Sequence, residues 1–137
     1  MCETNAKLMK YFYLLLSLFA STLAFAQKQD PEKEIYDFVG KELEKYSQSL
    51  QLEVWQEFYI DSILTHDYLA LRKELETLSR AKVESSDNYV IVQDKWMEQI
   101  YSSFQKVLSP EQWQKYLKQG AGREKKARDK RKEKRNK

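Results

Sequence analysis

The longest uninterrupted helical pattern of this chain runs from Leu52 to Arg80, where neither proline nor glycine occurs. Apolar side chains recur there at intervals of three and four residues, at Ile60, Leu64, Tyr68, Leu71, Leu75 and Leu78. This spacing predicts one amphipathic helix, which would be about 40 Å long at 1.5 Å per residue. A helix of this length is too long to be buried in a chain of 137 residues. We therefore expect it to be the spine of a helical hairpin or of a dimer.

A second long helix is predicted after a polar break at residues 82–88, with Ser86 or Asp87 as its cap and its end near Val107. Shorter helices are predicted from Pro31 to about Ser47 and from Pro110 to the Gly120-Ala121-Gly122 triplet. The run Tyr89–Val92 alternates weakly but lies inside a helical period. The predicted fold is all-α: a long antiparallel helical hairpin with shorter flanking helices, in an elongated homodimer.

The N-terminal region has the pattern of a secretory signal peptide. Lys7 and Lys10 precede an apolar run of 16 residues, 11–26, which ends in the small-x-small triplet Ala24-Phe25-Ala26. Because a membrane-spanning helix needs about 20 apolar residues, cleavage is favoured over a retained anchor. We expect residues 1–26 to be removed and residues 27–137 to act in the periplasm. Met9 makes a more usual start than Met1.

Charge is distributed unevenly along the part that remains. Residues 27–117 carry 11 Lys and Arg against 17 Asp and Glu, whereas residues 118–137 carry 11 against 3. We expect a helical domain at 27–122 and a frayed or disordered basic tail at 123–137, where Ala127 is the one apolar residue. The tail can bind an anionic lipid or lipopolysaccharide, fold back onto the acidic body, attract acidic clients, or only keep the chain soluble. Its candidate contacts with an anionic surface are Arg123, Lys125, Lys126, Arg128, Lys130 and Arg131.

Catalysis and metal binding find little support in the sequence. His66 is the only histidine, and Cys2, the only cysteine, lies ahead of the predicted cleavage site. Neither a glycine-rich loop nor a nucleophile elbow is present, so we predict a protein that is not an enzyme and needs no metal and no cofactor. Nucleic acid is an improbable partner for an exported chain.

Two short motifs begin predicted helices. In Leu108-Ser109-Pro110-Glu111-Gln112, Ser109 and Gln112 suit a capping box, in which each side chain bonds the other residue's amide. The upstream segment Leu52-Glu53-Val54-Trp55-Gln56 has leucine and glutamine in the same register, 56 residues earlier. It carries Glu53 in place of a hydroxyl residue, so we expect its capping-box chemistry to be lost.

These motifs, Leu52 with Gln56 and Leu108 with Ser109 and Gln112, resemble the Leu-Thr-x-x-Gln motif of the Spy/CpxP-like envelope proteins. The resemblance covers about residues 50–120. It implies a thin, curved, helical homodimer that holds unfolded envelope proteins without ATP, or that signals envelope stress by binding a membrane sensor. The alternative function is a non-catalytic envelope adaptor that binds a sensor or an anionic surface through its basic tail.

Aromatic residues are plentiful in the helical region. Their simplest interpretation is the core of the hairpin, and any part that stays exposed becomes a candidate surface for clients. The candidate client-binding residues are Trp55, Phe58, Tyr59, Trp96, Tyr101 and Trp113.

Overall fold

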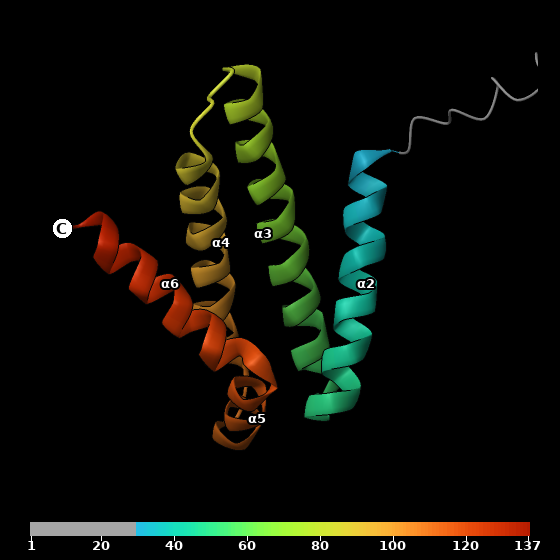
Figure 1. Ribbon diagram of the computed structural model, residues 1–137. Helices are drawn as coiled ribbons and strands as arrows, with labels where there is room; N and C mark the ends of the chain where they lie inside the picture. Colours follow the sequence, from blue (N-terminus) through green and yellow to red (C-terminus); the bar gives the residue numbers. More distant parts are fainter. Residues whose placement is uncertain (1–29) are drawn as a thin grey trace, which may run out of the picture. The chain divides into compact units, whose positions relative to one another are not determined.

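The computed structural model describes residues 30–137, and helices make up most of this part. The helices are α2 (Pro31–Leu50), α3 (Val54–Arg80), α4 (Ser86–Val107), α5 (Pro110–Tyr116), a π-helical turn η2 (Leu117–Ala121) and α6 (Gly122–Arg135). Figure 1 shows α3 and α4 side by side, joined at one end by residues 81–85. The all-α prediction is confirmed for this part of the chain. The predicted signal peptide lies outside the described residues.

The core lies where α2, α3, α4 and α5 meet. Its fully buried side chains are Val39, Leu50, Ile60, Leu64 and Phe104. The Phe104 ring packs edge-on against Tyr46 of α2, with 5.4 Å between centroids, and lies 5.2 Å from the ring of Tyr116 in α5. The helix that the sequence predicts as a long spine packs against α2 and α4, which bury Ile60 and Leu64. Farther along its apolar face, Leu71, Leu75 and Leu78 are only partly buried.

Helix starts follow the sequence signals in part. The predicted capping box at Ser109 is present: Gln112 N–H donates to Ser109 Oγ at 3.3 Å, and Ser109 N–H donates to Gln112 Oε1 at 2.9 Å. The predicted cap of α4 was wrong, because its N-cap is Ser85 and the Ser85 side chain makes no capping bond. Ser86 instead opens the helix, one residue later.

The expected loss of capping-box chemistry at Glu53 was also wrong. Glu53 is the N-cap of α3, and a capping box with Gln56 is present there. The Glu53 N–H donates to Gln56 Oε1 at 3.0 Å. The Glu53 carboxylate makes no capping hydrogen bond of its own, so the box depends on the Gln56 side chain. The negative charge of Glu53 still suits the helix N-terminus.

The predicted interruption at Gly120 is present. The backbone at Gly120 has φ of 125°, inside the π-helical turn that separates α5 from α6. Residues that carry a side chain rarely adopt this backbone φ. The chain therefore changes direction at a residue that only glycine fits without strain.

Gly120→Ala is expected to lower the free energy of unfolding by about 1–3 kcal/mol, because of backbone strain at positive φ. A Cβ at Gly120 would meet no atom within 4 Å, so crowding contributes nothing. Gly40→Ala is the matched control, since Gly40 lies inside α2 with equal space around it. That change should raise the free energy of unfolding by about 0.5–1 kcal/mol. Urea unfolding measures both, and a shift of the same sign in the two variants would contradict the strain at Gly120.

The basic tail differs from the prediction of a frayed or disordered extension. Residues 122–135 form α6, and Arg128 is buried within it. Ionic contacts with α4 hold this helix in place of the apolar contacts that its sequence lacks. Of the roles considered for the tail, folding back onto the acidic body is the one that the structure has.

Candidate functional site

The two motif copies meet at their glutamines. Gln56 Nε2 donates to Gln112 Oε1 at 2.7 Å, and Gln112 Nε2 donates to Gln56 Oε1 at 3.0 Å. Gln56 is buried, and its Nε2 also donates to the Val107 carbonyl at 3.0 Å. Gln112 Nε2 reaches the carbonyls of Leu50 and Gln51 at 3.4 and 3.3 Å.

This amide pair ties four helix ends together. It lies at the start of α3 and the start of α5, and it bonds the last carbonyls of α2 and α4. Leu108 of the second motif is buried in the core, and Leu52 of the first packs against that core. The motif residues therefore position helices. Their polar atoms are used up in bonds within the chain, which leaves them little capacity for a ligand.

An exposed aromatic surface lies next to this junction, on the first turns of α3. Val54, Trp55, Phe58 and Tyr59 are 84%, 50%, 68% and 53% exposed, and we call them the α3 aromatic patch. The Tyr59 ring lies edge-on to the rings of Trp55 and Phe58, at centroid distances of 6.2 and 5.7 Å. The Trp55 indole N–H donates to Glu53 Oε2 at 2.6 Å. The patch is thus pre-arranged by its own contacts while its faces stay open to water.

The other three candidate client-binding residues lie elsewhere and are partly buried. Trp96 on α4 donates its indole N–H to Glu74 Oε2 at 2.8 Å. Tyr101 and Trp113 pack against each other edge-on, 4.8 Å between centroids, at the margin of the core. The structure therefore brings together Trp55, Phe58 and Tyr59 and separates them from the other three.

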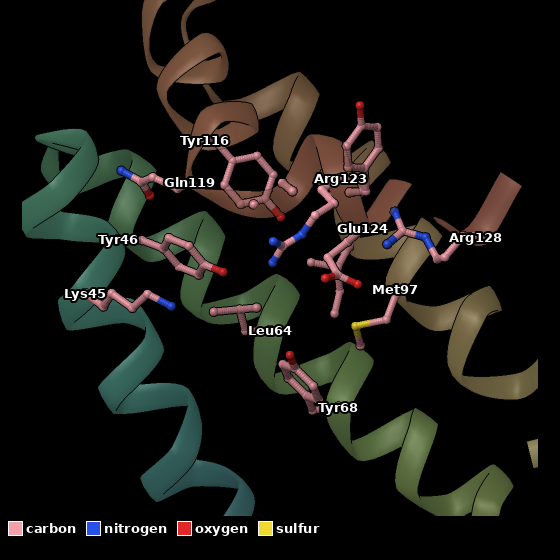
Figure 2. A pocket seen from close by; sticks show the side chains of 14 residues that line it. Lys45, Tyr46, Leu64, Tyr68, Met97, Tyr116, Gln119, Arg123, Glu124 and Arg128 are labelled. Carbon is pink, nitrogen blue, oxygen red and sulfur yellow. The ribbon is translucent and has the colours of Figure 1, made fainter. Parts of the chain in front are cut away.

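A hollow of about 300 Å³ opens where all the helices converge (Figure 2). Its apolar lining comes from Leu64 on α3 and from Met97 and Ile100 on α4. Four tyrosines also line it, Tyr46, Tyr68, Tyr101 and Tyr116, together with Lys45, Gln119, Gly120, Ala121, Arg123, Glu124 and Arg128. Figure 2 shows the Arg123 guanidinium reaching between Tyr46 and Tyr116.

Burial is the main reason that tyrosines of the hollow hold their protons tightly. It raises the pKa of Tyr116 to about 12 and moves the pKa values of Tyr46 and Tyr68 in the same direction. The interaction of each tyrosine with nearby acidic groups adds to the shift. All three hydroxyls are therefore neutral at physiological pH and can donate hydrogen bonds.

The inner face of α6 binds two acids of α4. Asp94 accepts from Arg131 Nη2 at 2.5 Å and from Arg131 Nε at 3.0 Å, and Arg135 lies 3.4 Å away. Glu98 pairs with Arg128 and Lys125, each at 3.3 Å. The hydrogen bond from Arg131, followed by the charges of Arg131 and Arg135, holds the pKa of Asp94 below its ordinary range.

The six candidate contacts for an anionic surface consequently fall into two groups. Lys125, Arg128 and Arg131 are engaged with α4. Lys126 and Lys130 are exposed, and Arg123 lines the hollow. Half of the predicted surface is thus already neutralised by the chain itself.

His66 is exposed, and its Nδ1 lies 2.8 Å from Oδ1 of the buried Asp67. Within residues 30–137 no cluster of three or more His, Cys, Asp or Glu residues is placed to hold a metal ion. In that same part, no helix combines the length and the apolar character that crossing a membrane requires.

Comparison with protein-family models, curated proteins and solved structures gives no match for this chain.

Sequence reasoning missed the hollow and the acids that hold α6. Tyr46 and Tyr116 are ordinary members of apolar helical stripes, and their convergence depends on how α2 and α5 pack. A weak signal for the α4 contact was present, since Asp94 and Glu98 are four residues apart and so lie on one helix face.

Proposed function

We propose that this chain is a non-catalytic, chaperone-like protein of the cell envelope, akin to the Spy/CpxP-like proteins, which holds unfolded clients without ATP. The α3 aromatic patch carries the proposal. It consists of four neighbouring apolar residues, each half exposed or more. Exposure of such a cluster to water is unfavourable, and covering its rings with an apolar segment of a client lowers the free energy.

Charge next to the patch suits unfolded clients of mixed composition. Glu53 and Glu57 begin the same helix, and Asp61 follows on it. An apolar cluster bordered by charges contacts both apolar and cationic segments of a client, and neither contact requires a defined sequence. The predicted export to the periplasm and the homodimer belong to this proposal.

The rival function, an adaptor that binds an anionic surface or a sensor through the basic tail, has weaker support. Lys125, Arg128 and Arg131 would have to leave Glu98 and Asp94 before they could bind another anion. Deleting residues 123–137 separates the two functions: client holding should survive the deletion if the patch is responsible, and partner binding should disappear if the tail is.

The test of the proposal is suppression of aggregation of a chemically denatured model protein. The chain should suppress aggregation at equimolar amounts, and Trp55→Ser/Phe58→Ser/Tyr59→Ser should need at least tenfold more protein for the same effect. The control is Tyr36→Ser/Ile91→Ser, which removes exposed apolar side chains outside the patch, at 51% and 41% exposure. The control should act like the unchanged chain.

Two results would reject the proposal. One is no suppression by the unchanged chain at any ratio. The other is equal loss in the patch variant and the control, which would make the effect one of general surface hydrophobicity. The solution mass of both variants shows whether the patch also joins two copies, because a shared interface would turn the patch variant into a monomer.

A further inference from the structure

Two side chains of opposite charge line the hollow without ion pairs. Arg72, Arg80, Arg128, Arg131 and Arg135 each form an ion pair with an acid. Arg123 is the one arginine within residues 30–137 that forms none, and its neighbour Glu124 forms none in that part of the chain either. Both are exposed, at the mouth of the hollow.

The remaining charges around the hollow are already matched. Lys45 lies 3.5 Å from Glu42 on the same helix, and Arg128 lies 3.3 Å from Glu98. The available charge is therefore one guanidinium and one carboxylate, with no excess of either sign. This balance favours a ligand that carries one charge of each sign over a simple anion or cation.

Apolar and aromatic side chains form part of the lining of the hollow. Leu64 and Ile100 form part of the buried core, and the partly buried Met97 packs against that core. The rings of Tyr46, Tyr68 and Tyr116 add flat surfaces, and their hydroxyls point toward the open space in Figure 2. Polar and charged side chains make up the rest of the lining, so the hollow joins apolar surface to convergent polar groups, as small-molecule sites commonly do. Its volume of about 300 Å³ is at the lower end of the usual size.

We propose that the hollow binds a free amino acid with an apolar side chain, such as leucine or phenylalanine. The ligand carboxylate lies on the Arg123 guanidinium, its ammonium group on the Glu124 carboxylate, and its side chain against Leu64 and Met97.

The chemistry of each contact fits the groups present. A guanidinium offers two parallel N–H donors to a carboxylate, a stronger arrangement than a single bond. The neutral hydroxyl of Tyr116 lies beside Arg123 and supplies a further donor to the same carboxylate. The site is separate from the α3 aromatic patch, none of whose residues line the hollow, so it does not depend on the proposed function.

Titration calorimetry on the purified full chain tests this site with four probes. L-leucine should bind with a Kd of about 1 mM or tighter. N-acetyl-leucine lacks the ammonium charge, leucinamide lacks the carboxylate, and octanoate is an apolar anion. Each of the three should bind at least tenfold more weakly than leucine.

Variants assign the two charges. Arg123→Gln and Glu124→Gln should each weaken leucine binding at least tenfold, and should keep the melting temperature because neither side chain has an ion pair to lose. Lys126→Gln is the control: this exposed lysine lies one helical turn further along α6 and does not line the hollow. The affinity of this control variant for leucine should stay within twofold of that of the unchanged chain.

The outcomes separate the alternatives. Equal binding of octanoate and leucine would reduce the hollow to an anion site and overturn the proposal, as would equal binding of leucinamide or of N-acetyl-leucine. No heat with L-leucine or L-phenylalanine at tens of millimolar would overturn it outright. If Lys126→Gln lost as much affinity for leucine as Arg123→Gln and Glu124→Gln, the effect would be one of general charge, which also contradicts the proposed site.

Discussion

A chain carrying Gln56→Ala is expected to unfold with a free energy about 2–4 kcal/mol smaller than that of the unchanged chain. The Gln56 amide is buried and bonds Gln112, the Val107 carbonyl and the Glu53 amide. Truncation leaves these partners without their bonds in a place that water reaches poorly. It also leaves a space at the point where α2, α3 and α5 meet. Urea unfolding monitored by circular dichroism measures the change.

Gln105→Ala provides the matched control for that variant. Gln105 is exposed on α4, so its replacement should change stability by less than about 0.5 kcal/mol. A loss of the same size in both variants would show that the motif glutamine has no special structural role.

A double-mutant cycle separates the amide pair from the rest of the network. Gln56→Ala/Gln112→Ala should cost less than the sum of the single changes by about 1–2 kcal/mol, because each single change leaves the other amide unpaired. Additive costs would mean that each glutamine acts through its carbonyl partners and capping bonds alone.

The sequence predicts the positions of these residues but not their contact. Leucine and glutamine at matching places in two helix starts are visible as local patterns, and so is the Ser109 cap. The bond between Gln56 and Gln112 joins residues 56 positions apart and requires the bend between α4 and α5 at Leu108. Periodicity fixes the face of a helix, but it does not fix which neighbour that face meets.

The aromatic residues illustrate the same limit. Trp55 lies one residue before its motif glutamine and Trp113 one residue after its own, so the two rings lie on different faces of their helices. Trp55 is half exposed, while Trp113 packs against Tyr101 and Tyr116. The register distinguishes the two faces, but it does not show which of them meets a neighbouring helix. The exposure of each tryptophan therefore depends on how whole helices pack, which local sequence does not show.

The tail shows where compositional reasoning gave a wrong result. A segment with only one apolar residue was expected to stay free because it cannot be buried by the hydrophobic effect. That expectation omitted the matching acids on another helix. Asp94 pairs with Arg131 across 37 positions of sequence, and pairs at that separation leave no local pattern.

Asp94→Asn is expected to release α6 from α4. The helix has one apolar residue, Ala127, so its position depends on ionic contacts, and Asp94 holds both Arg131 and Arg135. Hydrogen exchange at neutral pH should become at least tenfold faster at the backbone amides of residues 123–135, while α3 and the core of α4 keep their rates. Asp61→Asn, on an exposed position of α3, is the control and should leave α6 unchanged.

Acid should have the same effect as the substitution, and the direction follows from the Asp94 pKa. Contact with Arg131 lowers that pKa in the docked state, so the undocked state takes up a proton more readily. Docking is therefore strongest above the ordinary pKa of an aspartic acid and weakens as pH falls through the lowered value. Amide chemical shifts of α6, followed from pH 6 to pH 2, should move toward those of Asp94→Asn at neutral pH. Shifts that stay constant over this range, or α6 exchange unaffected by Asp94→Asn, would mean that Glu98 and its two cations hold the helix without Asp94.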